Sequence, residues 1–300
     1  MSKRVPQLGE TGTQIVGPTA KFRVHNRCLE KSMAISWIPA YHKRFAGQFE
    51  SSSGGVEIMG KLNKKVVLIT GGGSGVGQAA AKLLAAEGAH VAIAGRDRVK
   101  LQKAAEAISP QILAIPTDVC DSEQVANLVS QVTKAFGPID ILVNNAGTNI
   151  KARRMRELTL EAWNNLVKTN LDGAFFCIHA VLPSMLERKD GVIINVNSIS
   201  GKRPYPLAGA GYAAGKFGLH ALAGCLANEE LDSGIRVSSI YPGEIDTPIL
   251  EVRPTPVSAE QRAKILKPED VASAILFVAT LPPHVSVPEL IIKPTSQGYF

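Results

Sequence analysis

From Lys64 onward, the sequence alternates short apolar runs rich in β-branched residues with longer segments of helical composition. Six of these runs are expected to be strands: residues 65–70, 90–94, 111–116, 139–147, 191–198 and 235–243. Their apolar residues do not alternate cleanly with polar ones, which indicates that helices cover both faces of the sheet. This pattern predicts an α/β fold, a single doubly wound domain of Rossmann type with about seven parallel strands and helices on both faces.

The segments between these runs have the start and stop signals of helices. An alanine-rich helix is expected over 78–88, ending at Gly88, and another over 122–137, with Ser122 as its N-cap and Gly137 past its end. Two long helical stretches are expected near 159–188 and 210–232.

Residues 1–59 differ from the rest of the chain, because they have no sustained period and end in the Ser/Gly stretch 51–55. They lack the apolar core of a signal peptide, and their four glutamates argue against a mitochondrial transit peptide. Two interpretations remain: a poorly ordered extension, or a start codon assigned too early, with initiation at Met59. We favour the second, since the regular pattern begins just after Met59, and we expect the folded domain to span 60–300.

The formal net charge of +7 does not indicate a nucleic-acid-binding protein. Residues 1–59 carry eight Lys or Arg against four acidic residues, whereas the remainder carries 25 against 22, so the folded body is close to neutral. No apolar run reaches the roughly 18 residues that indicate a membrane span. The scattered cysteines form no metal-binding motif and suggest reduced thiols in a cytoplasmic protein; they are Cys28, Cys120, Cys177 and Cys225.

The segment TGGGSGVG (70–77) lies between a predicted strand and a predicted helix, as a dinucleotide-binding loop requires. Gly71 permits the tight turn after the strand, Gly75 lets the backbone approach a diphosphate, and Gly77 lets the helix pack closely. The alternative Gly75-x-Gly77-x-x-Ala80 register is disfavoured, because its turn would begin five residues after the strand ends. The cofactor-binding residues expected here are Thr70, Gly71, Ser74, Gly75, Val76 and Gly77.

Further motifs follow in order, and together with the glycine loop the chain resembles the short-chain dehydrogenase/reductases over about residues 62–293. The motifs are NNAG (144–147), Asn170 in TNLDGAFF, Ser198 in NVNSISG, Tyr212 and Lys216 in YAAGK, and YPGEIDTP (241–248). The resemblance implies an NAD(P)(H)-dependent oxidoreductase that interconverts a ketone and a secondary alcohol.

The resemblance also implies the roles of four catalytic residues. Tyr212 would donate a proton to the carbonyl oxygen, Ser198 would hydrogen-bond the same oxygen, Lys216 would tune Tyr212 and hold the ribose, and Asn170 would hold a relaying water. A free phenol has a pKa of about 10, and a nearby ammonium together with an oxidised nicotinamide would lower it. Ser198 and Tyr212 are 14 residues apart, one more than we expect, and the extra residue falls in 201–211. Ser200 is the rival for the serine role.

Cofactor choice depends on the end of the second strand, where Gly95 occupies the position expected for a ribose-binding acid and Arg96 follows. This favours NADP(H), with NAD(H) possible, because an arginine can meet the 2′-phosphate. Asp97 is either an alternative ribose ligand or a helix N-cap. By resemblance, the other cofactor-binding residues are Asp118, Val119, Asn145, Ala146, Gly147, Tyr212, Lys216, Pro242, Gly243, Ile245 and Thr247.

The substrate is expected to be a small carbonyl compound or alcohol. A 3-oxoacyl-acyl-carrier-protein reductase is one alternative, and a catalytically silent NAD(P)-binding sensor is another. The basic run Lys151, Arg153, Arg154 and Arg156 could dock an acidic carrier protein or be a solvated helix start, and we favour the second. The lid segment 248–266 has no obvious anion clamp. The resemblance implies a homotetramer or homodimer paired through the two long helical stretches.

Overall fold

The computed structural model describes residues 60–298, and the predictions made for residues 1–59, including the one for Cys28, lie outside this range. Seven strands form one sheet: β1 (Val66–Thr70), β2 (His90–Gly95), β3 (Leu113–Pro116), β4 (Ile141–Asn144), β5 (Gly191–Val196), β6 (Ile235–Pro242) and β7 (Glu289–Ile292). All neighbouring strands are parallel, in the order β3-β2-β1-β4-β5-β6-β7. The predicted parallel α/β fold is confirmed.

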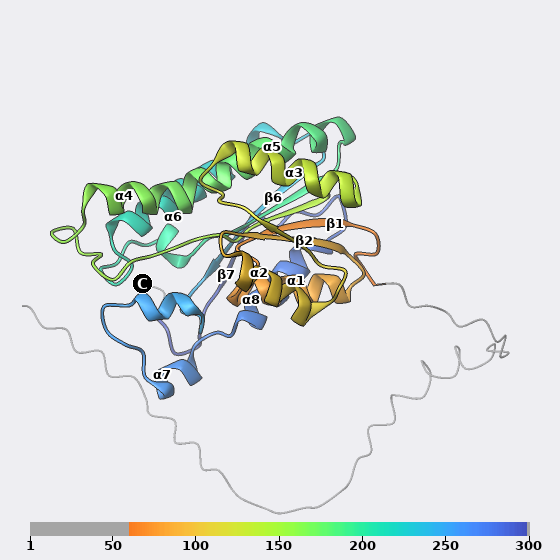
Figure 1. The fold of residues 1–300 in the computed structure, drawn as a ribbon. Helices are drawn as coiled ribbons and strands as arrows, with labels where there is room; N and C mark the ends of the chain where they lie inside the picture. The colour runs from red at the N-terminus through yellow and green to blue at the C-terminus, as the bar shows by residue number, and fades with distance from the viewer. Residues whose placement is uncertain (1–59, 299–300) are drawn as a thin grey trace, which may run out of the picture. The chain divides into compact units, whose positions relative to one another are not determined.

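Helices lie on both faces of this sheet (Figure 1). They are α1 (Gly75–Ala86), α2 (Arg98–Ile108), α3 (Ser122–Phe136), α4 (Leu160–Val167), α5 (Gly173–Arg188), α6 (Ala210–Glu229), α7 (Ala259–Lys264) and α8 (Pro268–Ala279). One core packs α1, α2 and α8 against side chains such as Val67 and Ile69, and the other packs α3, α5 and α6 against Val66 and Leu68. Successive side chains of β1 thus enter opposite cores, which is why the strand sequence shows no polar alternation.

One local prediction needs correction and another needs refinement. Asp121, not Ser122, is the N-cap of α3, because its carboxylate accepts hydrogen bonds from the main-chain N–H groups of Glu123 and Gln124. The stretch 159–188 is helical from Leu160 to Arg188 as expected, but it includes a π-helical turn, η1 (Lys168–Asp172), between α4 and α5.

The order of the strands reverses at β1, which pairs with β2 on one side and β4 on the other. In such sheets ligands bind beyond the carboxyl ends of the strands at this switch point. The glycine loop follows β1 and the NNAG segment follows β4, so the topology brings both to that place. No helix formed by residues 60–298 is long and apolar enough to cross a bilayer.

Candidate active site

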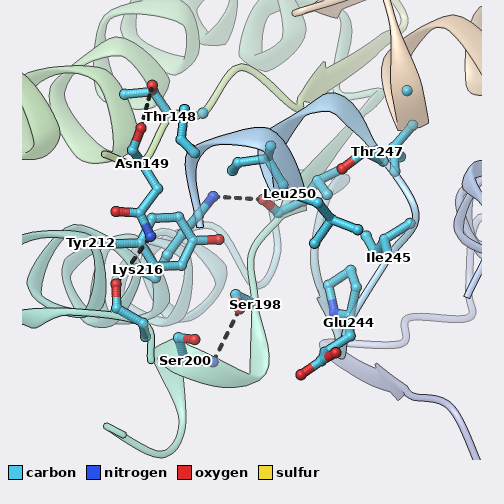
Figure 2. Close-up of a pocket in the computed structure, with 18 of the residues that line it drawn as sticks. Thr148, Asn149, Ser198, Ser200, Tyr212, Lys216, Glu244, Ile245, Thr247 and Leu250 are labelled. Carbon is cyan, nitrogen blue, oxygen red and sulfur yellow. Dashed lines mark hydrogen bonds between the residues drawn. The ribbon is translucent and has the colours of Figure 1, made fainter. Parts of the chain in front are cut away.

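A cavity of about 440 Å³ lies at the carboxyl ends of β1, β4, β5 and β6. Most of the predicted site residues line it: Gly71, Ser74, Gly75, Val76, Asn145, Ala146, Gly147, Ser198, Tyr212, Lys216, Pro242, Gly243, Ile245 and Thr247. Figure 2 shows Tyr212 and Lys216 on one side, with Ile245 and Thr247 across from them. Motifs that are far apart in the sequence therefore meet around one space.

The glycine loop has the close backbone geometry that the sequence predicts. Gly71 and Gly75 have φ of +66° and +54°, in the left-handed region that favours glycine. A Cβ at Gly77 would lie 2.4 Å from the carbonyl oxygen of Gly71, so only glycine lets α1 approach the loop this closely.

The N-terminus of α1 suits an anion. Its N-cap, Ser74, is extended and makes no side-chain capping bond, so the side chain leaves the N–H groups of the first turn available. Gly75 and Val76, the first residues of the helix, line the cavity. These N–H groups and the helix dipole fit a diphosphate.

Thr70 and Asn145 hold the loops after β1 and β4 together. Thr70 Oγ1 accepts hydrogen bonds of 3.0 Å from the main-chain N–H groups of Asn145 and Ala146. In return, the Asn145 amide donates to the carbonyl oxygens of Thr70 (2.9 Å) and Gly71 (3.2 Å). Thr70 is therefore a positioning residue behind the cavity, and Asn145 both positions the loop and lines the cavity.

Asn170 lies in the π-helical turn and is almost fully buried. Its amide donates to the carbonyl oxygens of Thr148 (2.9 Å) and Leu166 (2.8 Å), and its Oδ1 accepts from Thr148 N at 3.1 Å. A Cβ at Gly147 would lie 3.0 Å from Asn170 Oδ1 and 3.6 Å from Lys216 Nζ. A glycine at this position therefore leaves room for both side chains. The side chain of Asn170 thus holds the main chain beside Lys216.

Of the two candidate serines, Ser198 is the one that contacts Tyr212. A hydrogen bond from Ser198 acts on the Tyr212 phenol, and Ser198 Oγ accepts from Ser200 N at 3.1 Å (Figure 2). Ser200 also lines the cavity, but it is 1% exposed and supports Ser198 through this bond. The extra residue in 201–211 therefore does not separate Ser198 from Tyr212.

Tyr212 and Lys216 lie one helical turn apart on α6, and Lys216 Nζ is 5.8 Å from the centre of the Tyr212 ring. Nζ donates a 2.9 Å hydrogen bond to the carbonyl oxygen of Val196. Burial lowers the pKa of Lys216 to about 8. Burial raises the pKa of Tyr212 to about 12, against the opposing effects of the Ser198 hydrogen bond and the Arg153 charge. The lowering expected for Tyr212 is therefore absent in the chain by itself.

Arg96 and Asp118 line a second hollow of about 460 Å³, which shares Thr148 with the first. Arg96 is exposed, and Asp118 accepts a hydrogen bond from Cys120 N at 3.0 Å. Asp97 is the N-cap of α2, since its Oδ1 accepts from Lys100 N at 3.0 Å. The Val119 side chain is buried in the core and packs close to Gly173.

Comparison with known proteins shows which family the chain belongs to. The family model described as short chain dehydrogenase matches residues 65–256, which is more than half of the chain. The chain belongs to the short-chain dehydrogenase family. It is an oxidoreductase of the kind that acts on CH–OH groups with NAD(P).

Other members of the short-chain dehydrogenase family cover most of the chain. An uncharacterised oxidoreductase of Staphylococcus aureus (strain MW2) is 36% identical over 234 residues, which are 78% of this chain and 98% of the relative. The closed form of a serine dehydrogenase complexed with NADP+ is 30% identical, with a TM-score of 0.73 over 78% of this chain and 96% of that one. A 3-ketoacyl-(acyl-carrier-protein) reductase from Brucella melitensis complexed with NADH is 32% identical, with a TM-score of 0.72 over 77% and 98% of the two chains.

One site residue of this short-chain dehydrogenase was misjudged from the sequence. Arg153 is not part of a solvated basic run, because it is 5% exposed and lines the cavity, whereas Lys151, Arg154 and Arg156 are exposed. Its guanidinium donates to three carbonyl oxygens, those of Ile150 (2.6 Å), Leu207 (3.0 Å) and Val252. A run of basic residues has no local signal that tells its buried member from its exposed ones.

Sequence analysis also missed several other residues that line the cavity. They are Thr148, Asn149, Asn197, Tyr205, Glu244 and Arg253, among others. Arg253 and Glu244 form an ion pair of 3.4 Å. Thr148 and Asn149 directly follow NNAG, so reading that motif two residues further would have found them.

Proposed function

We propose that this protein interconverts a ketone and a secondary alcohol, and that it works as an NADPH-dependent carbonyl reductase. The observation that carries the proposal is that Ser198, Tyr212 and Lys216 line the same cavity as the glycine loop. A carbonyl group there lies within reach of two hydroxyl groups, beside a loop suited to a dinucleotide.

In the proposed mechanism, Ser198 and Tyr212 hydrogen-bond the substrate's carbonyl oxygen, and Tyr212 gives its proton to that oxygen during reduction. The nicotinamide cofactor, when bound, supplies the hydride. Positioned proton donors of this kind contribute about 10²–10⁴-fold to rates. In the oxidation direction Tyr212 takes the proton back, so its pKa controls both directions.

The Tyr212 pKa must fall in the complex for this chemistry to run near neutral pH. The Ser198 hydrogen bond and the Arg153 charge already act in that direction, but burial outweighs them. We propose that the positive charge of an oxidised nicotinamide and the nearby Lys216 ammonium lower it further. Lys216 would also hold the ribose hydroxyls, and Asn170 would keep a relaying water near Lys216 through the main chain of Thr148.

NADP(H) is the proposed cofactor, since Gly95 leaves no carboxylate at the end of β2 and Arg96 is exposed beside Asp118 in the second hollow. Asp97 is engaged at the N-terminus of α2, which favours Arg96 over Asp97 as the group that meets the cofactor. We propose that the Asp118 side chain and the main chain of Val119 flank the adenine, and that Pro242, Gly243, Ile245 and Thr247 contact the nicotinamide. The similar structures hold NADP+ in one case and NADH in another, so the preference rests on these residues.

A second candidate function is 3-oxoacyl-acyl-carrier-protein reduction, favoured by the similarity to such a reductase. An acidic carrier protein could bind the three exposed basic residues Lys151, Arg154 and Arg156. A carrier-bound substrate should then be reduced much faster than a small thioester, and substitution of the three by glutamine should remove the difference.

The direct experiment measures turnover of a panel of ketones, alcohols and 3-oxoacyl thioesters with NADPH, NADP+, NADH and NAD+. Turnover of ketones or alcohols, faster with the phosphorylated cofactors, supports the proposal. Cofactor binding without turnover of any compound would instead support the NAD(P)-binding sensor. We also propose that residues 60–300 suffice for activity, so a variant beginning at Met59 should match the full chain.

A further inference from the structure

The cavity carries an excess of positive charge that the carbonyl chemistry does not explain. Its charged lining residues are Arg153, Lys216, Arg253 and Glu244, which are three cations and one carboxylate. Charges at such a depth are costly unless they are paired. Lys216 has an assigned role in the proposed mechanism, but the two arginines do not.

Arg153 and Arg253 line the same cavity, and their charges interact. Arg153 donates to the carbonyl oxygen of Val252, the residue directly before Arg253. The charge of Arg253 acts on Arg153 and, with burial as the larger cause, lowers the Arg153 pKa. Glu244 Oε1 lies 3.4 Å from Arg253 Nη2. Within the described residues, Arg153 forms no ion pair with a carboxylate.

Both guanidinium groups keep hydrogen-bonding capacity. Arginine has five N–H donors, of which Arg153 uses three on carbonyl oxygens, so two remain. The side chain of Arg253 is 16% exposed, and its ion pair with Glu244 is longer than a good hydrogen bond. A planar carboxylate matches such a pair, because it can accept two N–H groups at once.

We propose that Arg153 and Arg253 bind the carboxylate of the substrate, which is therefore a hydroxy acid or oxo acid. This inference rests on the proposed ketone–alcohol chemistry and narrows its substrate class. Arg153 interacts electrostatically with Tyr212 as well as with Arg253, and all three residues line the same cavity. The substrate's carboxylate is then separated from the reacting carbon by only a few bonds, which favours a short acid over a long acyl thioester.

The test compares matched acids and esters in the oxidation direction, because free 3-oxo acids lose carbon dioxide. Both enantiomers of 2- and 3-hydroxybutanoate and their methyl esters are assayed with NADP+ and NAD+. We expect kcat/KM for the best acid to exceed that of its ester by about tenfold to a hundredfold, as charge-assisted hydrogen bonds would give. Arg253→Gln should lower this acid-to-ester ratio at least tenfold, and Arg253→Lys by less.

Arg154→Gln is the matched control, since it removes an exposed positive charge next to Arg153 and should leave the ratio unchanged. If Arg253→Gln does not fold, butanoate and butanamide are compared as inhibitors of ketone reduction by the unmodified protein. Butanoate should bind at least tenfold more tightly. Oxidation of the esters as fast as the acids, or inhibition as strong by the amide, would overturn this inference and leave the proposed function intact. Absence of turnover for every acid, ester and ketone would count against the proposed function itself.

Discussion

The guanidinium of Arg153 donates a hydrogen bond to the carbonyl oxygen of Val252, 99 positions further along the chain. Two more bonds reach Ile150 and Leu207, so one buried side chain ties together the loop after β4, the loop before α6 and the 3-10 turn η3 (Pro248–Val252). Arg153 also packs against Gly209 through its Cβ and its carbonyl oxygen, and the φ of Gly209 is +79°. These three segments form one wall of the active site.

Replacing Arg153 by Met should destabilise the protein by about 2–4 kcal/mol, because three carbonyl oxygens lose a charged donor. For a domain of this size, the fall in Tm should be roughly 4–16 °C. Thermal unfolding followed by circular dichroism measures it, with Arg154→Met as the exposed control that should stay close to the unmodified protein. Equal Tm values for the two variants would show that the three bonds add little.

Tyr212→Phe should retain the fold and cofactor affinity but lose about 10²–10⁴-fold in kcat, because only the proton donor is removed. Steady-state kinetics measures the loss, and a fluorescence titration with NADPH checks that the cofactor still binds. Unchanged turnover in this variant would exclude the proposed mechanism.

Lys216 should contribute a rise in stability with pH between about 8 and 10, which the raised pKa of the buried Cys177 thiol opposes above pH 9. Lys216 has a pKa of about 8 when folded against 10.5 ordinarily, so in this window the unfolded chain binds a proton that the folded chain does not. A shift of this size corresponds to about 3 kcal/mol, and Lys216→Met should lack the rise. Denaturant unfolding from pH 7 to 10 tests it.

Above pH 10 the sign should reverse. Tyr212 has a pKa of about 12 when folded against 10.0 ordinarily, so the folded protein holds a proton that the unfolded chain loses. The free energy of unfolding should therefore fall as the pH rises from 10 toward 12, and Tyr212→Phe should reduce this fall. An identical decline in the unmodified protein and in Tyr212→Phe would mean that the pKa of Tyr212 is not raised in the folded protein.

NADPH should bind about tenfold to a hundredfold more tightly than NADH, because Arg96 can pair with the 2′-phosphate. The preference should weaken at high salt, since Arg96 is solvent-exposed. Gly95→Asp combined with Arg96→Ala should invert it. Fluorescence titrations measure the dissociation constants of NADPH and NADH. Tighter binding of NADH by the unmodified protein would refute the role of Arg96.

The protein should form a homotetramer or a homodimer in solution. Phe175 on α5 and Phe217 on α6 are 45% and 37% exposed, which a partner subunit would cover. Phe175→Glu should weaken the assembly, whereas Val99→Glu on α2, on the opposite face of the sheet, should not. Light scattering at micromolar concentration measures the mass, and a monomeric mass for the unmodified protein would contradict the expectation.

The order of strands and helices could be predicted from the sequence because it depends on short-range patterns. Apolar runs such as that of β1 indicate strands, and glycines such as Gly71 and Gly77 permit the tight turn and close approach that follow β1. The motif residues Ser198, Tyr212 and Lys216 could be predicted for the same reason. Ser198 follows a predicted strand, and Tyr212 and Lys216 are four positions apart in a predicted helix. The cap at Asp121 and the π-helical turn at Asn170 were missed, because side-chain competition and packing decide such details.

The character of the cavity was decided only by the tertiary structure. In the sequence, Arg153 resembles its exposed neighbours, and the lid segment 248–266 shows no anion clamp. Arg153 is distant in the chain both from Val252, whose carbonyl oxygen it binds, and from Arg253. Only folding brings Arg153 to Val252 and beside Arg253, and buries Tyr212 and Lys216 so that their pKa values move apart. Desolvation and charge–charge interactions depend on distances in space, which local sequence patterns do not contain.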